Sequence, residues 1–97
     1  MKLFHRTSLA SADVLSAADA FFPRLNLAST AKMPRGRTFA GPLGTVSLTV
    51  AAEGGHATFV EVSTDQIGES RLDKNVKFFF VGLHQQVDPG HALAAGY

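Results

Sequence analysis

The chain has 97 residues, of which 45% are hydrophobic and 18% charged, and its formal net charge is +1. This length fits one domain, the hydrophobic fraction is too high for intrinsic disorder, and the balanced charge argues against a protein that mainly coats nucleic acid. Cysteine is absent from the sequence, which excludes disulfides and thiolate chemistry and is typical of a reducing compartment, so we expect a cytoplasmic location.

The N-terminal region predicts a strand followed by a helix. Residues 2–7 are β-prone, and residues 11–22 carry their apolar side chains on one face of a helical period, with Ser8 or Ser11 as the N-cap. Pro23 ends this helix, because a proline ring clashes with the preceding helical turn. The pattern is typical of an amphipathic helix that packs on a sheet.

Residues 24–43 are rich in helix-breaking and strand-breaking residues. Two prolines and two glycines fall within this segment, at Pro34, Gly36, Gly41 and Pro42. They indicate a long flexible connection with at most a short strand over residues 37–40.

The next segment carries the clearest β signal. Residues 44–52 alternate apolar and polar side chains, Gly54 and Gly55 suit a tight turn, and residues 56–63 return with a second alternating run. The sequence therefore predicts an antiparallel hairpin.

Residues 72–87, LDKNVKFFFVGLHQQV, form the most apolar stretch and fit either a helix or a strand. Their apolar residues recur at helical spacings of four, three, one, three and four, whereas a strand accounts only for residues 76–83. Ser70 is a candidate N-cap, so we predict a helix over residues 70–87 and keep a fourth strand as the alternative. Gly82 counts against the helix, since an interior glycine costs about 1 kcal/mol relative to alanine.

Together these elements predict a small two-layer α+β domain over residues 1–97, with a C-terminal tail over residues 88–97. An antiparallel sheet of three to four strands would carry the two helices packed on one face. The longest apolar run, residues 76–83, is far shorter than the ~20 residues of a membrane span, so we expect a soluble protein. The predicted core is Leu3, Val14, Leu15, Ala18, Phe21, Phe22, Val46, Leu48, Val50, Val60, Val62, Leu72, Val76, Phe79, Phe80 and Leu83.

Two apolar residues of the last helix lie outside its core stripe. Phe78 and Val81 project toward the polar side, which also holds Arg71, Lys74 and Gln85. A helix with apolar residues on both sides needs a neighbour on both sides. Either the C-terminal tail folds over Phe78, or these five residues form an interface with a partner or a second subunit.

Basic residues are concentrated in the first half of the chain. Residues 1–52 carry six basic and two acidic residues, whereas residues 53–97 carry three basic and six acidic residues. Lys32, Arg35 and Arg37 are candidate contacts for an anion or a partner, because arginine binds phosphate and carboxylate through paired hydrogen bonds. Aromatic residues are scarce around them, which argues against nucleic acid as the partner.

No residue pattern indicates a metal, a cofactor or a catalytic centre. The four histidines lack the pairing of a helical metal site: His5, His56, His84 and His91. Four residues could in principle move protons: Glu61, Asp65, Glu69 and His84. Because most domains of this size contain such residues, we expect no metal, no cofactor and no catalytic residue.

The order of strand, helix, long connection, hairpin and long final helix resembles a shortened helix-grip domain of the START-like class. This resemblance rests on element order and implies an apolar ligand held between the sheet and the terminal helix. A single hairpin is shorter than the seven-stranded sheet of the full grip. We expect first a non-catalytic accessory or assembly subunit that docks on a protein partner or on itself. The alternatives are a small apolar-ligand binder and, third, a small enzyme that uses acid/base residues.

Overall fold

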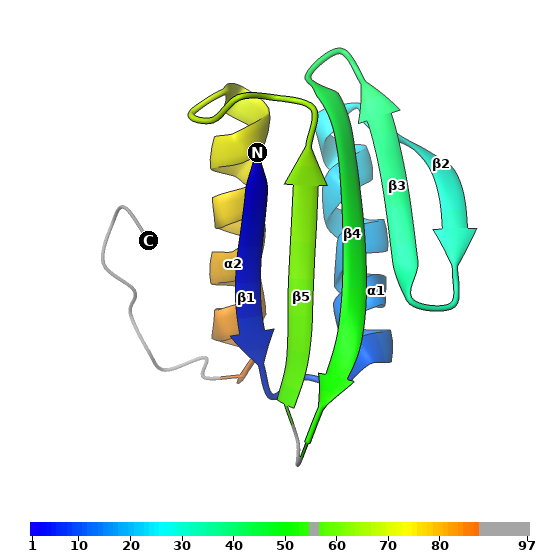
Figure 1. The fold of residues 1–97 in the computed structure, drawn as a ribbon. Coiled ribbons are helices and arrows are strands. Elements are labelled where there is room, and N and C mark those ends of the chain that lie inside the picture. The colour runs from blue at the N-terminus through cyan, green and yellow to red at the C-terminus, as the bar shows by residue number, and fades with distance from the viewer. Residues whose placement is uncertain (55–56, 88–97) are drawn as a thin grey trace.

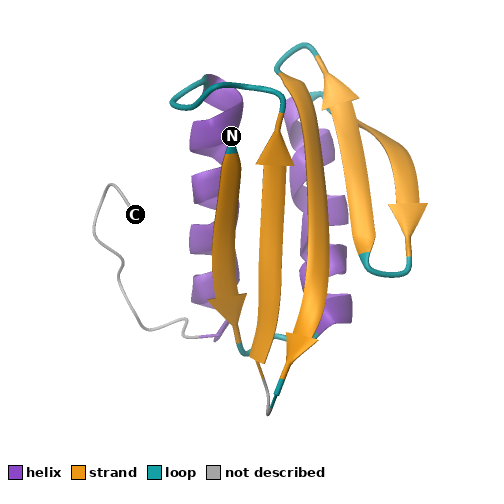
Figure 2. Ribbon diagram, viewed as in Figure 1, coloured by secondary structure: helices purple, strands orange, loops and turns teal. Residues whose placement is uncertain are grey.

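The computed structural model describes residues 1–54 and 57–87. It is an α+β fold in which a five-stranded antiparallel sheet, in the order β1-β5-β4-β3-β2, carries both helices on one face (Figures 1 and 2). The elements are β1 (Lys2–Thr7), α1 (Ser11–Phe21), the 3-10 turn η1 (Phe22–Leu25), β2 (Ala28–Met33), β3 (Gly36–Gly41), β4 (Gly44–Glu53), β5 (Ala57–Thr64) and α2 (Arg71–Val87).

The predicted final helix is confirmed, since α2 spans Arg71–Val87 and includes residues 76–83. Ser70 precedes it as the predicted cap. The Ser70 hydroxyl accepts a hydrogen bond from the Asp73 N–H at 3.1 Å, and Asp73 Oδ2 accepts hydrogen bonds from the Ser70 N–H at 3.3 Å and from the Ser70 hydroxyl at 2.9 Å. This reciprocal arrangement is a capping box, which satisfies N–H groups that the first helical turn leaves unpaired.

The predicted first helix and hairpin are also confirmed, but the predicted N-cap of the helix was wrong: it is Ala10, with no side-chain cap hydrogen bond, and neither Ser8 nor Ser11. α1 covers Ser11–Phe21 and continues as η1, in which Pro23 takes a position that needs no N–H donor. β4 and β5 pair along their length, with Leu48 opposite Val62 and Val50 opposite Val60. β1 completes this side of the sheet by pairing with β5.

The predicted number of strands was too low, because residues 24–43 contain two strands. Asn26, in the left-handed region with φ 63°, redirects the chain after η1, and β2 then pairs with β3. Pro34 and Arg35 connect β2 to β3, and β3 also pairs with β4. The prolines and glycines of this segment therefore mark turns between strands rather than a single long connection.

The core lies between the sheet and the two helices. All the predicted core residues lie there, although Leu3 and Phe21 are only partly buried. Leu27 and Phe39 are fully buried and were missed, because they belong to the segment predicted as a connection. Phe22 contacts both Phe39 and Phe79, with ring centroids 5.2 and 5.1 Å apart, so these aromatic rings fill the space where α1, α2 and β3 meet.

The length and the apolar character of the helices bear on whether either could span a membrane. Within residues 1–54 and 57–87, neither helix is long and apolar enough to cross a membrane. The predicted tail over residues 88–97, and with it the suggestion that the tail covers Phe78, lies outside the described residues.

Candidate functional site: the groove between the helices

A groove of about 210 Å³ runs between α1 and α2 on the surface of the helix layer. We call it the Phe78 groove. Its lining is mainly small and aromatic residues from both helices: Ala17, Ala20, Phe21, Arg24, Phe78, Phe79, Gly82, Leu83 and Gln86.

The wall of the groove that α1 forms is shallow because its side chains are small. Ala17 and Ala20 lie three residues apart and share one face of the helix. Arg24 follows on the same side, within η1, and supplies the positive charge in the lining. Phe21 contacts Phe79 of α2, with ring centroids 5.5 Å apart, so the two helices meet at an aromatic contact along this wall.

The α2 side combines a protruding aromatic residue with a glycine. Phe78 is 64% exposed, which is unusual for a phenylalanine in so small a domain. Gly82 lies one turn further along α2, and a Cβ added there would have no atom within 4 Å. The groove therefore presents a knob, the Phe78 ring, next to a hollow that Gly82 and the two alanines leave open.

Of the five predicted interface residues, Phe78 lines this groove and the other four do not. Arg71, Lys74 and Gln85 are exposed on the same side of α2 as Phe78, and Val81 is half-buried. This arrangement matches an apolar centre with a polar rim, the usual anatomy of a protein interface. Partner binding at this surface stays a prediction.

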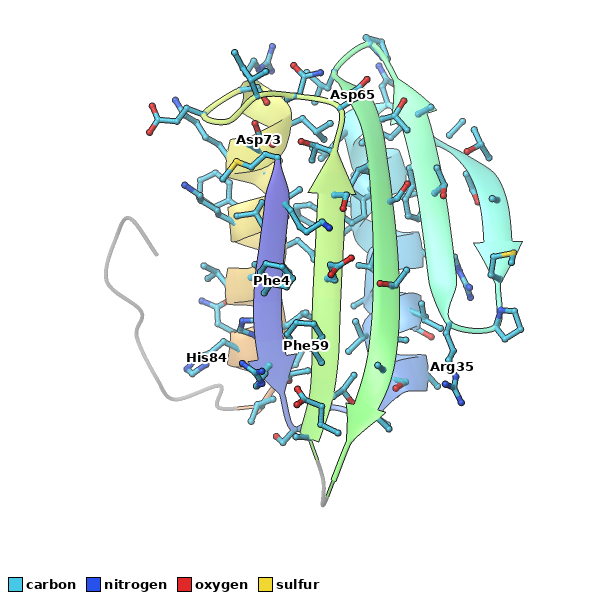
Figure 3. The ribbon with its side chains drawn as sticks, viewed as in Figure 1. Phe4, Arg35, Phe59, Asp65, Asp73 and His84 are labelled. Atoms are coloured by element: carbon cyan, nitrogen blue, oxygen red, sulfur yellow. The ribbon has the colours of Figure 1, made fainter. Side chains whose placement is uncertain are left out.

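The basic run predicted as an anion or partner contact is divided by the fold. Arg37 donates hydrogen bonds to both carboxylate oxygens of Asp19, at 3.0 and 3.2 Å, and to the carbonyl oxygens of Met33 and Gly36. Lys32 and Arg35 are exposed at the β2–β3 hairpin. Arg35 lies at the end of this hairpin (Figure 3), where it lines a shallow hollow together with Met33. Arg37 thus ties β3 to α1, while the other two remain candidate contacts.

The candidate acid/base residues are not gathered into one site. Asp65 lies at one end of the sheet and His84 at the other (Figure 3). Glu61 lies on β5, in register with Phe4 of β1, and Glu69 belongs to the loop before α2. In the part of the chain that the structure describes, no group of three or more His, Asp or Glu residues could hold a metal ion.

Two of the histidines lie where β1 and α2 meet. The His5 ring stacks on Phe80 with centroids 5.0 Å apart, and burial together with the neighbouring His84 lowers the pKa of His5. His56 and His91 are outside the described residues.

A second aromatic patch lies on the face of the sheet that the helices leave open. Phe4, 53% exposed, stacks on Phe59 at 5.4 Å, and Arg6 lies over the Phe59 ring and pairs with Glu53 at 2.9 Å (Figure 3). This patch was missed from the sequence, although the alternation of Lys2, Phe4 and Arg6 along one strand face signals it. The Phe4 ring stacks on Phe59, and the Arg6 guanidinium pairs with Glu53, so both side chains have partners within the domain. The patch is therefore explained as a contact between neighbouring strands.

Comparison with known proteins does not identify a family. No protein family model matches this chain, and no curated protein matches it.

Proposed function

We propose that this protein is a non-catalytic accessory or assembly subunit that binds another protein chain through the Phe78 groove. The cytoplasm is the proposed compartment, because the sequence has no cysteine.

Gly82 is the observation that carries this proposal. An interior helical glycine lowers helix stability by about 1 kcal/mol relative to alanine. Such a cost is usually explained by close packing, yet the space around Gly82 is open within the described structure. A chain that approaches the helix closely from outside would explain why no side chain stands there.

Burial of Phe78 would provide most of the binding free energy at this surface. Exposed charged pairs contribute only about 0–1 kcal/mol each, so affinity must come from apolar burial. A single aromatic anchor at the centre of an interface can be worth ~2 kcal/mol or more. Arg71, Lys74 and Gln85 surround Phe78 and would form the polar rim that excludes water from it.

The alternative functions have less support. A helix-grip binder would hold its apolar ligand between the sheet and α2, where Phe22, Phe39 and Phe79 already pack against one another. An acid/base enzyme would need His84 near one of the candidate carboxylates, and Asp65 lies at the opposite end of the sheet from His84 (Figure 3).

The proposal can be tested with the full chain expressed in its own cell and recovered under native conditions. Native mass spectrometry then distinguishes a bound protein from a bound small molecule. We expect a protein chain on the wild type that is lost from Phe78→Ala and from Gly82→Leu, which places a side chain in the groove at a position where an added Cβ meets no atom within 4 Å.

Phe4→Ala is the matched control, since Phe4 is similarly exposed but lies on the opposite layer. It should keep the bound chain. A small apolar molecule on the wild type instead, or equal loss from Phe4→Ala and Phe78→Ala, would contradict the proposed function.

A further inference from the structure

We propose that the chain that occupies the Phe78 groove is a second copy of this protein, in a two-fold symmetric dimer. This inference rests on the proposed function and names its partner. A two-fold interface uses the same surface twice, so that surface must be complementary to itself. The Phe78 groove meets this requirement, because it carries a knob and a hollow side by side on one helix.

The spacing of Phe78 and Gly82 fixes the arrangement. They are four residues apart, one turn of α2, and therefore lie on the same side of it. If two copies of α2 cross in antiparallel orientation with the two-fold axis midway between these residues, each Phe78 faces Gly82 of the other copy. Both rings then enter both hollows in a single contact.

The same register avoids contacts between like charges. Antiparallel pairing about that midpoint places Lys74 opposite Gln86 and Asn75 opposite Gln85. These pairs can form hydrogen bonds across the interface. A parallel arrangement would instead place Lys74 against Lys74 and Arg71 against Arg71, which costs free energy.

The α1 side of the surface adds complementary charges. Asp13 precedes Ala17 by one helical turn on the same side of α1, and Arg24 lies at the other end of this row. α1 and α2 run in opposite directions along the sheet (Figure 1). In an antiparallel dimer, the Arg24 end of one copy approaches the Asp13 end of the other.

Sedimentation equilibrium of the purified full chain tests this inference. We expect a concentration-dependent dimer, weakened about 1,000-fold by Phe78→Ala, because the two-fold contact loses two hot-spot rings and each is worth about 30-fold. Gly82→Leu should weaken it similarly, because it fills the hollow, whereas the control Phe4→Ala should dimerise like the wild type.

Mixing the two variants gives the decisive measurement. A mixed dimer of Phe78→Ala with Gly82→Leu retains one ring and one hollow that fit, and it pairs the shortened side chain at position 78 with the filled position 82. With one variant labelled with ¹⁵N, native mass spectrometry should therefore show mixed dimers in excess over both homodimers.

The alternative outcomes separate the two proposals. A monomer at all concentrations that binds a different protein, with sensitivity to Phe78→Ala, would overturn the dimer and leave the proposed function standing. A monomer that binds no protein and loses thermal stability on Phe78→Ala would show that its own chain covers the ring, which overturns both. Dimers that are indifferent to both variants would also overturn this inference.

Discussion

At Gly82, the stability of the helix and the proposed contact favour different side chains. An alanine Cβ would meet no atom within 4 Å, and alanine is the best helix former. We therefore expect Gly82→Ala to raise the free energy of unfolding of the monomer by about 0.5–1 kcal/mol, measured by chemical denaturation at low protein concentration.

Gly44→Ala is the control for this prediction. Gly44 has φ +128°, and an added Cβ would lie 2.5 Å from Asp65 Oδ1, so alanine should destabilise the protein there. A loss of stability from Gly82→Ala would mean that something in the monomer already occupies the space beside that residue.

Asp73 joins three parts of the structure through one buried carboxylate. Its side chain is 0% exposed and accepts hydrogen bonds from the Thr64 hydroxyl at 2.6 Å and from the Ser70 hydroxyl at 2.9 Å. Burial raises the pKa of Asp73, but the hydrogen bonds from Thr64 and Ser70 outweigh it and leave the pKa below its ordinary value of 3.8. The carboxylate therefore stabilises the fold above that value, and this contribution is lost as the pH falls through the lowered pKa.

Replacement of Asp73 by alanine should be costly. It removes the capping box and leaves the Thr64 and Ser70 donors unpaired, for which we expect a loss of about 2–3 kcal/mol in the free energy of unfolding at neutral pH. Thermal and chemical denaturation at pH 7 measure it. Glu69→Ala is the control in the adjacent exposed loop, and an equally large loss there would refute the specific role of Asp73.

At the scale of elements, the sequence predicts those helices and strands whose apolar residues recur with a clear period. α1, α2 and the β4–β5 hairpin bury one face each, so their apolar residues repeat at 3.6 or 2 residues and reveal both the type and the buried face. β2 has no such period, because all six of its residues are exposed at the edge of the sheet. Its irregular register between Ser29 and Ala31 weakens the pattern further.

Hydrogen exchange should divide the segment over residues 24–43, which the sequence predicts to be flexible as a whole. β2 has one neighbouring strand and a fully exposed surface, whereas β3 pairs on both sides and buries Phe39. We expect β2 amides to exchange markedly faster than β3 amides, as measured by NMR. Uniform fast exchange across both strands would support flexibility of the whole segment and contradict this division.

The contact between β1 and α2 should weaken in acid. Burial and the nearby His84 lower the pKa of His5 below 6.5, so the folded protein binds a proton there less readily than the unfolded chain. Its contribution to stability is therefore complete above pH 6.5 and is lost as the pH falls through the lowered pKa. His5→Gln should reduce the pH dependence of the melting temperature in this range, and an unchanged profile would contradict the prediction.

At the scale of the whole molecule, the fold mixes the two charged halves of the sequence. β1, from the basic half, pairs with β5 from the acidic half, and Arg37 pairs with Asp19 within one half. The charge asymmetry along the chain therefore does not become two opposed faces, and long-range attraction between such faces is not expected. Chain order alone could not reveal this, because the β1–β5 pairing joins residues that are far apart in sequence.

The candidate site was predictable only in part, because it also depends on contacts between residues that are far apart in sequence. Phe78 could be identified because it departs from the apolar stripe of its own helix, a property of one element. The hollow beside it depends on two helices lying side by side, so that Ala17 and Ala20 of α1 face Gly82 of α2. In the sequence, the hollow was indicated by Gly82 alone, because an interior glycine destabilises a helix and nothing else in the sequence explains it.

Charge at the rim of the groove should affect the rate of dimerisation more than its strength. In the proposed dimer, Arg24 of one copy lies near Asp13 of the other, and exposed pairs of this kind contribute about 0–1 kcal/mol. Arg24→Glu replaces this attraction by repulsion. We expect slower association and at most about a 30-fold weaker dimer, since the two-fold contact holds two such pairs, with salt accelerating association of the variant and slowing that of the wild type.

Stopped-flow dilution and mixing at several salt concentrations measure these effects, and Arg35→Glu is the control with the same change in net charge. Arg35 is exposed at the β2–β3 hairpin and does not line the groove. If Arg35→Glu changes the salt dependence as much as Arg24→Glu, the hairpin makes a contact of its own, as the basic run of the sequence suggests. Recovery of fast association when Asp13→Lys is added to Arg24→Glu would place these two residues opposite each other, because the exchanged charges attract again only if they meet across the interface.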